Sequence, residues 1–393
     1  MNQMLPIVRR IASEAQALAV AAALRDRIAE GAAMRDRDRV LPVPEIEALT
    51  EAGLWAITAP ARFGGADVSY ATLVEVVALL AEGDASIAHI PQNHFATLET
   101  LRHIGSEEQQ REFFSRVLRG TRFGNAEAER GEPTTLRDDG FSLRLDGTKF
   151  YSTGALFAHL ITVSARDDAG RVVLAIVERD APGLTLHDDW DGMGQRTTGS
   201  GTTILDGVRV PPARVLPLHR AFERRTPVGS FAQMLHAAID LGIARGALRE
   251  TAAFVRERSR PFAEAQVARA DQDPLLLERF GRVRVHVHAA ESLLSRAATA
   301  LDTARADPGD DAHIAAAAVA VAEAKAMTTE AALDAATTLF ELAGSYATRA
   351  VFGLDRFWRD ARTHTLHDPV RWKYHAIGRF FLTGEAPAGR SYF

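Results

Sequence analysis

The order in which the chain changes its residue pattern constrains the possible folds most strongly. From Ile7 to about Arg119 the sequence is rich in Ala, Leu, Arg and Glu and predicts helices, one of them starting at Ser106. Residues from Thr121 onward alternate apolar and polar positions and predict a β region. Helical periodicity returns at about Ala221 and continues toward the C-terminus. A β region between two helical regions is an uncommon order, so few folds fit it.

Three stretches of the β region predict specific strands and turns. FSLRLDGTKFYSTG alternates around Asp146-Gly147, which predicts a hairpin that turns at this pair. HLITVSARDDAGRVVLAIVERD predicts two strands joined by a polar Asp-Asp-Ala-Gly turn. TTILDGVRVPP predicts a further strand that ends at Pro211-Pro212.

The C-terminal region contains three long apolar seams at helical spacing, which predict an antiparallel helical bundle. The seams are Leu241, Ala244, Leu248, Thr251 and Val255; Phe280, Val283, Val287, Ala290, Leu294, Ala297 and Leu301; and Ile314, Ala317, Val321, Ala324, Thr328, Ala331, Ala335, Thr338 and Leu342. We therefore expect an α+β protein of three domains: a helical domain (residues 1–119), a β domain (120–218) and a helical bundle (219–393).

Composition excludes several classes of function. Charged residues make up 25% of the chain and the net charge is −5, which gives no reason to expect binding of nucleic acid or of an anionic membrane. The chain has no cysteine, so disulfides, thiolate metal ligands and cysteine nucleophiles are excluded. The Ala-rich run Ile314–Ala322 is too short to span a bilayer, and the N-terminus becomes charged too early for a signal peptide. We expect a cytoplasmic protein.

Near the C-terminus the stretch RTHTLHDP places His364 and His367 three residues apart. Three roles compete for this pair: metal ligands, polar side chains at a helix end, or groups that handle protons beside a cofactor. Two histidines alone make a weak metal site, no H-E-x-x-H motif occurs, and His286 and His288 belong to a separate stretch. We therefore expect no metal.

Several stretches resemble the acyl-CoA dehydrogenase superfamily: GMGQRTTGSGTTILDGVRVPPARVL, GTKFYSTGA and RERSRPFAEA. The resemblance extends along nearly the whole chain. It implies an N-terminal helical domain, a middle β-barrel or sandwich and a C-terminal four-helix bundle, with flavin bound between them.

The stretches FGNAEAE, KFYSTGA, RSRPFAEA and RDARTHTLHDPVRWK are similar to one branch of the superfamily. This branch comprises the reduced-flavin-dependent monooxygenases, which include dibenzothiophene monooxygenase and the SfnB family of sulfur acquisition oxidoreductases. One departure from the dehydrogenases favours it. Most of them carry a carboxylate base in a Tyr-Glu-Gly-Thr-like stretch, and THTLHDPV offers neither Glu nor Gly there.

The resemblance implies catalytic roles for His367, His364, His89 and Asn125, with His367 closest to the reacting atoms. From the residues alone, these histidines are also compatible with core or surface positions that have no role in catalysis. Asn125 is also compatible with a turn.

The resemblance also assigns cofactor contacts. Thr153 and Ser152 would hydrogen-bond the flavin ring, together with Asn125, and Arg258 and Arg260 would bind its phosphate. Ser345 and Arg349 of a neighbouring subunit would add phosphate contacts. Without the resemblance, a Ser-Thr pair in a strand and arginines at a solvated helix end are ordinary features.

The substrate would meet Asn93, His94 and Trp190. A tyrosine stands at the position of Asn93 in dibenzothiophene monooxygenase, which puts a bulky aromatic sulfur heterocycle in doubt. For His94 the alternative is a solvated helix start, and for Trp190 a cover over the β domain.

The implied reaction is a two-component monooxygenation, in which a flavin C4a-hydroperoxide passes oxygen from O2 to a small, sulfur-containing substrate. No G-x-G-x-x-G motif follows a strand and no phosphate-binding loop occurs, so reduced FMN should come from a separate NAD(P)H:flavin reductase. FAD remains an alternative cofactor, and a homotetramer built as a dimer of dimers is expected. Two other functions stay open: an FAD-dependent acyl-CoA dehydrogenase with a relocated base, and a non-catalytic binding protein of flavin fold.

Overall fold

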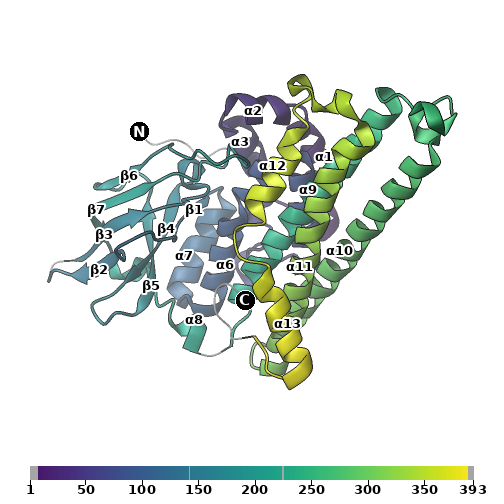
Figure 1. Cartoon of the computed structure of the whole chain (residues 1–393). Helices are drawn as coiled ribbons and strands as arrows, with labels where there is room; N and C mark the ends of the chain where they lie inside the picture. The colour runs from purple at the N-terminus through teal and green to yellow at the C-terminus, as the bar shows by residue number, and fades with distance from the viewer. Residues whose placement is uncertain (1–7, 141, 224, 388–393) are drawn as a thin grey trace.

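In a computed structural model the chain forms a β region between two helical regions, which confirms the expected fold class (Figure 1). The structure describes residues 8–140, 142–223 and 225–387. Residues 1–7, including Ile7 and most of the segment on which the signal-peptide expectation rests, lie outside this part. The boundaries at residues 119 and 218 fall in connections between elements, and they stay predictions of where the domains divide.

Seven helices make up the N-terminal region within the described residues, and α1, α4, α5 and α7 each begin at a residue whose side chain caps the helix. Ser106 caps α7 with its side chain, and the Gln109 side chain caps in return, which confirms the expected helix start. Ser69 and Asp84 cap α4 and α5 by accepting backbone N–H groups of the first turn with their side chains. The helices are α1 (Glu14–Ala29), α2 (Ala32–Asp38), α3 (Val43–Glu51), α4 (Tyr70–Gly83), α5 (Ala85–His89), α6 (Gln92–Ile104) and α7 (Glu107–Leu118).

The β region forms one sheet with the strand order β6-β7-β3-β2-β4-β5-β8, and β1 pairs with β4 in parallel. The strands are β1 (Phe123–Ala126), β2 (Thr135–Asp138), β3 (Leu143–Lys149), β4 (Leu160–Arg166), β5 (Val172–Glu178), β6 (Leu184–Leu186), β7 (Thr203–Val210) and β8 (Val215–Leu216). The β4–β5 hairpin and the end of β7 before Pro211 are confirmed.

The prediction of a hairpin that turns at Asp146-Gly147 is wrong. Strand β3 continues through this pair, and the connection lies between β2 and β3 instead. Gly147 has φ 151° at a register shift against β7, and a Cβ there would lie 2.5 Å from the Thr134 side chain. The glycine therefore serves a β-bulge and a close approach, where the local sequence alone predicted a turn.

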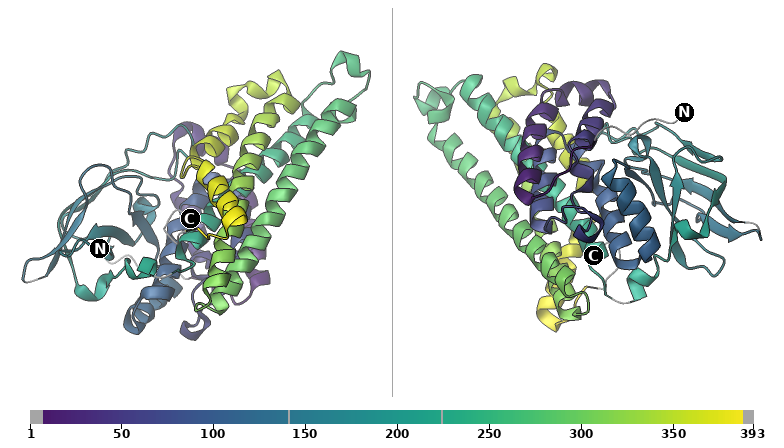
Figure 2. Two further views of the ribbon diagram at one scale, coloured as in Figure 1. Left: turned by 60° about the horizontal axis from the view of Figure 1, so that its bottom comes forward. Right: turned by 180° about the vertical axis from the view of Figure 1, so that it is seen from behind.

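The C-terminal region is built on the long helices α9 (Val228–Glu257), α10 (Pro274–Ala306) and α11 (Asp311–Ala343), which pack side by side (Figures 1 and 2). Shorter helices complete it: α8 (Arg220–Glu223), α12 (Asp355–His364) and α13 (Arg371–Thr383). Apart from Phe280, which is partly buried, all residues of the three predicted seams are buried. This confirms the bundle packing.

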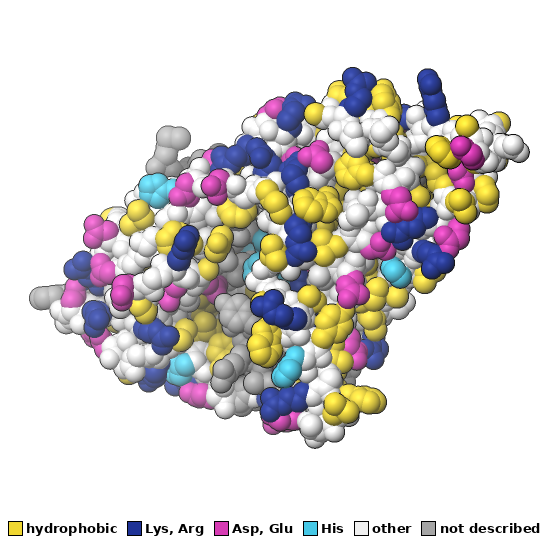
Figure 3. Space-filling model, viewed as in Figure 1, with side chains coloured by type: hydrophobic (Ala, Val, Ile, Leu, Met, Phe, Trp, Pro, Cys, Tyr) yellow, Lys and Arg dark blue, Asp and Glu magenta, His cyan; other side chains and the backbone are white. Residues whose placement is uncertain are grey.

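The surface carries mixed charge. On the face shown in Figure 3, Lys and Arg side chains are interspersed with Asp and Glu side chains over the β region and the helical regions. No helix in the described part of the chain is long and apolar enough to cross a membrane.

Helix α9 is central because it packs against both α4 of the N-terminal region and the other bundle helices. A Cβ on Gly242 would lie 2.4 Å from the Ala78 carbonyl oxygen of α4. The two regions therefore approach each other through a position that only glycine fits.

We expect Gly242→Ala to lower the free energy of unfolding by about 1–3 kcal/mol, since overpacking forces α4 and α9 apart. Gly281→Ala is the matched control, because this helical glycine has no neighbour within 4 Å. The control should be neutral or stabilising by about 0.5–1 kcal/mol. Urea denaturation measures both, and equal effects would contradict the tight crossing.

Candidate active site

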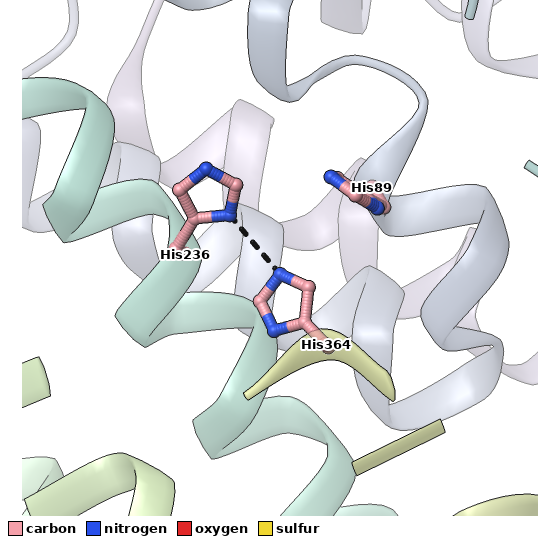
Figure 4. A group of neighbouring side chains, drawn as sticks. All are labelled: His89, His236 and His364. Atoms are coloured by element: carbon pink, nitrogen blue, oxygen red, sulfur yellow. Dashed lines mark hydrogen bonds between the residues drawn. The ribbon is translucent and has the colours of Figure 1, made fainter. Parts of the chain in front are cut away.

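Four histidines from three segments form one cluster where α5 of the N-terminal region meets the bundle. His89 ends α5, His236 lies near the start of α9, His364 ends α12, and His367 follows three residues later. The ring centroids of His89 and His364 lie 5.1 Å apart, those of His236 and His364 5.2 Å, and those of His236 and His367 4.0 Å. Figure 4 shows the rings of His89, His236 and His364 pointing toward one another. His367 lies at the exposed side of the cluster.

Sequence reasoning missed His236. Its stretch, MLHAAID, is an apolar helical run in which only His236 and Asp240 are polar, four residues apart and therefore on one helix face. Two polar side chains on the buried face of an apolar helix are the signal that pointed to it.

A buried chain of hydrogen bonds orients His364 and His236. The Lys325 Nζ donates to Asp240 Oδ2 at 2.6 Å, and the other carboxylate oxygen, Oδ1, lies 2.5 Å from His364 Nδ1. His364 Nε2 lies 3.1 Å from His236 Nδ1. Burial opposes the charge of Asp240, but Lys325 and His364 outweigh burial and lower the pKa of Asp240 to about 2. Asp240 is therefore an ionised acceptor.

Gln195 orients His89 from the β region. Its Oε1 lies 3.0 Å from His89 Nδ1, while its Nε2 donates to the Ala85 carbonyl at 3.2 Å. The backbone N–H of Gln195 donates to Asp360 Oδ1 at 2.6 Å, and burial raises the pKa of Asp360 to about 7. Because the amide nitrogen is used by Ala85, the amide oxygen faces His89, which fixes the Nδ1–H tautomer.

The buried imidazoles are neutral. Burial, followed by the neighbouring histidines, lowers the pKa of both His89 and His236 well below the ordinary value. The cluster therefore presents hydrogen-bonding nitrogens without adding positive charge at neutral pH.

The structure brings Thr153 and Asn125 together, in a turn that packs against the end of α5. Thr153 Oγ1 lies 2.7 Å from Ser200 Oγ, and the Thr153 carbonyl accepts from the Asn125 N–H at 3.1 Å. A Cβ on Gly154 would lie 2.9 Å from the Ile90 carbonyl oxygen, so this turn packs directly against the helix end that carries His89. Ser152 is turned to the interior, where its Oγ accepts from Thr203 Oγ1 at 2.7 Å.

Two of the expected substrate residues are engaged in internal hydrogen bonds. The Asn93 amide donates to Glu127 Oε1 at 3.3 Å and to Thr162 Oγ1 at 3.2 Å. His94 uses both ring nitrogens, at 2.7 Å from the Trp55 carbonyl oxygen and 3.1 Å from the Phe123 nitrogen. This arrangement places His94 in the core and leaves neither ring nitrogen for a substrate.

Trp190 is half-buried beside the Gln195 loop and donates its indole N–H to the Gln195 carbonyl at 2.9 Å. It borders an open cavity of about 220 Å³. The cavity is lined by Arg130, Phe150, Tyr151, Asp189, Trp190, Asp191, Ser200, Gly201 and Thr202. Ser200, the hydrogen-bond partner of Thr153, thus links this cavity to the segment beside the histidines.

The expected phosphate ligands gather at the opposite end of α9. Arg258, Arg260, Ser345 and Arg349 are exposed, and Ser259 Oγ donates to the Ala343 carbonyl at 3.0 Å, which joins the ends of α9 and α11. His236 lies 22 residues before Arg258, which corresponds to about 33 Å along the helix. Within one chain the structure therefore does not bring these arginines to the histidine cluster.

Two groups of described residues have the arrangement for a metal ion. The ligand atoms of His89, His236 and His364 lie within 4.8 Å of one another and are buried. Asp307, Asp310 and His313 meet the same distance criterion near the surface. The expectation of no metal stays a prediction.

Comparison with known proteins places this geometry in a family. Family models of the acyl-CoA dehydrogenase N-terminal, middle and C-terminal domains match residues 12–121, 124–208 and 234–372. The chain is 32% identical to dibenzothiophene monooxygenase of Rhodococcus erythropolis, covering 96% of each chain. It is 33% identical to the probable FMNH2-dependent monooxygenase SfnC of Pseudomonas putida, covering 96% of this chain and 97% of SfnC.

Solved structures of similar proteins indicate the same family. FMN-bound TdsC from Paenibacillus sp. A11-2 superimposes with a TM-score of 0.92 at 31% identity, covering 96% of this chain and 100% of TdsC. The methanesulfinate monooxygenase MsuC from Pseudomonas fluorescens gives a TM-score of 0.91 at 31% identity, covering 96% of this chain and 99% of MsuC. The chain therefore belongs to the acyl-CoA dehydrogenase family, in the branch that contains these flavin-dependent monooxygenases.

Proposed function

We propose that this protein is a two-component monooxygenase that uses FMNH2 and O2 to oxygenate a small sulfur-containing organic compound. The observation that carries the proposal is the cluster of neutral, oriented imidazoles beside Thr153 and Asn125. The relatives support it, because SfnC is named as FMNH2-dependent, MsuC as a methanesulfinate monooxygenase and TdsC as FMN-bound.

The residues present fit FMN. The Thr153 and Ser200 hydroxyls would hydrogen-bond the polar edge of the ring, and Trp190 and Tyr151 border the cavity beside them. Bound FMN would supply the activation of O2 and the transfer of one oxygen atom. The protein would bind and orient the reactants and exclude water from them.

The phosphate contacts belong to a second copy in this proposal. About 33 Å between His236 and Arg258 exceeds the length of an FMN molecule, so one chain cannot hold both ends. Exposed apolar side chains on α10 and α13, such as Val285, Trp372 and Phe381, give the bundle surfaces for association. A homotetramer built as a dimer of dimers satisfies both observations.

The imidazoles have distinct roles. His89, held by Gln195, presents Nε2 to the cluster and would hydrogen-bond the reacting oxygen atoms. His367 stacks against His236 from the exposed side, where it meets incoming substrate. The reaction takes place in the cytoplasm, where an NAD(P)H-dependent reductase supplies the reduced flavin.

The surroundings of Asn93 indicate the size and polarity of the substrate. Its amide is fixed by Glu127 and Thr162 at the position where an aromatic ring stands in dibenzothiophene monooxygenase. A fixed polar side chain favours a smaller and more polar substrate, of the class represented by methanesulfinate.

The proposal is tested by supplying the protein with FMN, NADH and a flavin reductase under ¹⁸O2. Candidate substrates are methanesulfinate, dimethyl sulfone and dibenzothiophene, and mass spectrometry detects the products. Incorporation of one ¹⁸O atom into a sulfur compound is the expected result. Hydrogen peroxide formation at the rate of free FMNH2, without product, would overturn the proposal. Bleaching of tightly bound FAD by an acyl-CoA would establish the dehydrogenase alternative.

We expect His367→Ala to leave FMN affinity nearly unchanged and to lower product per FMNH2 by about tenfold or more, with hydrogen peroxide in its place. A positioned acid–base group contributes about 10²- to 10⁴-fold. His313→Ala, an exposed histidine on α11, is the control. An unchanged ratio of product to peroxide in His367→Ala would remove this residue from the mechanism.

We expect Arg258→Ala to weaken FMN binding by about tenfold or more, since a charge-assisted hydrogen bond contributes about 1.5–3 kcal/mol. Arg256→Ala is the matched control, because this exposed arginine lies two residues earlier and is not assigned to the phosphate. Titration by flavin fluorescence measures both. Equal affinities of the two variants would contradict the assignment.

The stability of the protein should fall as pH decreases from 7 to 5. His236 has an ordinary pKa of 6.5 in the unfolded chain and a much lower pKa when folded, so the unfolded state binds more protons in this window. Urea denaturation at several pH values should show a smaller loss for His236→Asn than for the native protein. Identical losses would mean that His236 is not held neutral by the fold.

A further inference from the structure

A line of four hydrogen-bonded side chains runs from the middle of the bundle to the histidine cluster. It begins at Lys325 of α11, passes Asp240 of α9 and His364 of α12, and ends at His236 of α9. The side chains of Lys325 and Asp240 are 1% and 0% exposed. The oxygen-transfer proposal uses the histidines and leaves the buried ion pair without a role.

The direction of each hydrogen bond follows from the ion pair. The Lys325 ammonium and the Thr329 hydroxyl both donate to Asp240 Oδ2, at 2.6 and 3.1 Å, so Oδ1 remains for His364. An ionised carboxylate only accepts, and His364 Nδ1 therefore carries a proton. Lys325 already compensates the charge of Asp240, and a second buried cation would be uncompensated. The arrangement that adds no second buried cation has His364 Nε2 accepting from His236 Nδ1.

His236 is then left with a lone pair on Nε2. No group in the described part of the chain hydrogen-bonds this nitrogen, and Figure 4 shows it turned away from His364. The His236 ring lies against the exposed His367 at 4.0 Å and against His89 at 5.6 Å. The ring that carries the free nitrogen is thus in contact with both His89 and the exposed His367.

We infer that Lys325, Asp240 and His364 are positioning residues that fix the tautomer of His236, so that its Nε2 can accept a proton from a bound reactant. The inference rests on the proposed function for the identity of the reaction. A proton taken up at His236 Nε2 displaces the proton on Nδ1 to His364 Nε2. His364 then becomes an imidazolium beside the Asp240 carboxylate, and return of the proton restores the starting state.

A metal ion is the competing occupant, because the nitrogens of His89, His236 and His364 lie within 4.8 Å of one another. A histidine that ligates a metal ion donates its other ring N–H to a carboxylate, a backbone carbonyl or a water, and a carboxylate in that place adds negative charge behind the ligand. Here Lys325 neutralises the carboxylate behind His364, so this carboxylate offers a divalent ion little counter-charge. A proton, which the chain delocalises over two rings, suits these surroundings better than a divalent ion.

The test uses the double variant Asp240→Asn/Lys325→Met, which removes both charges together and leaves no unpaired buried ion. Thr329→Val is the matched control, because it removes one hydrogen bond to the same carboxylate and leaves the chain to His236 intact. Solid-state ¹⁵N NMR of the flavin-free protein, labelled at histidine, reports the tautomer of each ring. His236→Asn and His364→Asn spectra assign the signals.

We expect His236 and His364 to be protonated at Nδ1 alone in the native protein and in Thr329→Val. The double variant should lose this single pattern while its FMN affinity stays within about twofold of native. Product per FMNH2 should fall about tenfold or more in the double variant and in His236→Asn. Retention of the native tautomers in the double variant would overturn the inference, and so would unchanged coupling in His236→Asn.

The NMR signature separates this inference from the proposed function, since it requires neither flavin nor substrate. The native protein could show the expected tautomers, and the double variant could lose them, while the protein oxygenates no sulfur compound. This result would support the proposed positioning of His236 and refute the proposed function. If the double variant does not fold, two measurements still test the inference: product per FMNH2 in His236→Asn, and the His236 and His364 tautomers of the native protein. A shift of the His236 signal by one equivalent of zinc, abolished in His364→Asn and retained in His313→Ala, would overturn it in favour of a metal site.

Discussion

The ion pair between Lys325 and Asp240 is the interaction on which the histidine cluster depends. Both side chains are fully buried and join α11 to α9, and the second carboxylate oxygen orients His364 of α12. Removing one partner from a buried pair costs about 3–5 kcal/mol, because the other charge is left uncompensated. Three helices that are distant in sequence are thus tied at one point, and the same tie determines which nitrogen of His364 carries a proton.

One loop of the β region, which carries Gln195, is fixed to both α5 and α12. Gln195 orients His89, and Asp360 of α12 holds the Gln195 backbone. Arg359 adds an ion pair to Asp36 and a hydrogen bond to the Met193 carbonyl. Because α12 carries both the loop contacts and His364, the hydroxyl groups near Thr153 and the imidazoles keep a fixed relation. One fold can host different chemistry by exchanging such side chains, as the absence of Glu from THTLHDPV illustrates.

Local sequence signals predicted the site unevenly. His364, His367, His89, Asn125 and Thr153 were all named, and the structure gathers them where α5, α12 and the turn after β3 meet. His236 was missed, although His236 and Asp240 are polar residues four apart in an otherwise apolar helical stretch, and what they bind became clear only from the packing of α12. His94 was named for substrate, although Trp55 and Phe123 use both of its ring nitrogens. The arginines near Arg258 lie at the far end of α9, which only a second copy reconciles with the cluster.

By itself the sequence determined the order of helical and β regions, the three seams of the bundle, the β4–β5 hairpin and the end of β7, because periodicity and turn chemistry act within a few residues. The tertiary structure decided the rest. Asp146-Gly147 has the chemistry of a turn, yet close approach to Thr134 makes it a bulge. His236 and His364 are 128 residues apart and form a hydrogen bond because Lys325 compensates the buried Asp240 carboxylate, which in turn orients His364. Such compensation depends on distances between elements, which no local pattern contains.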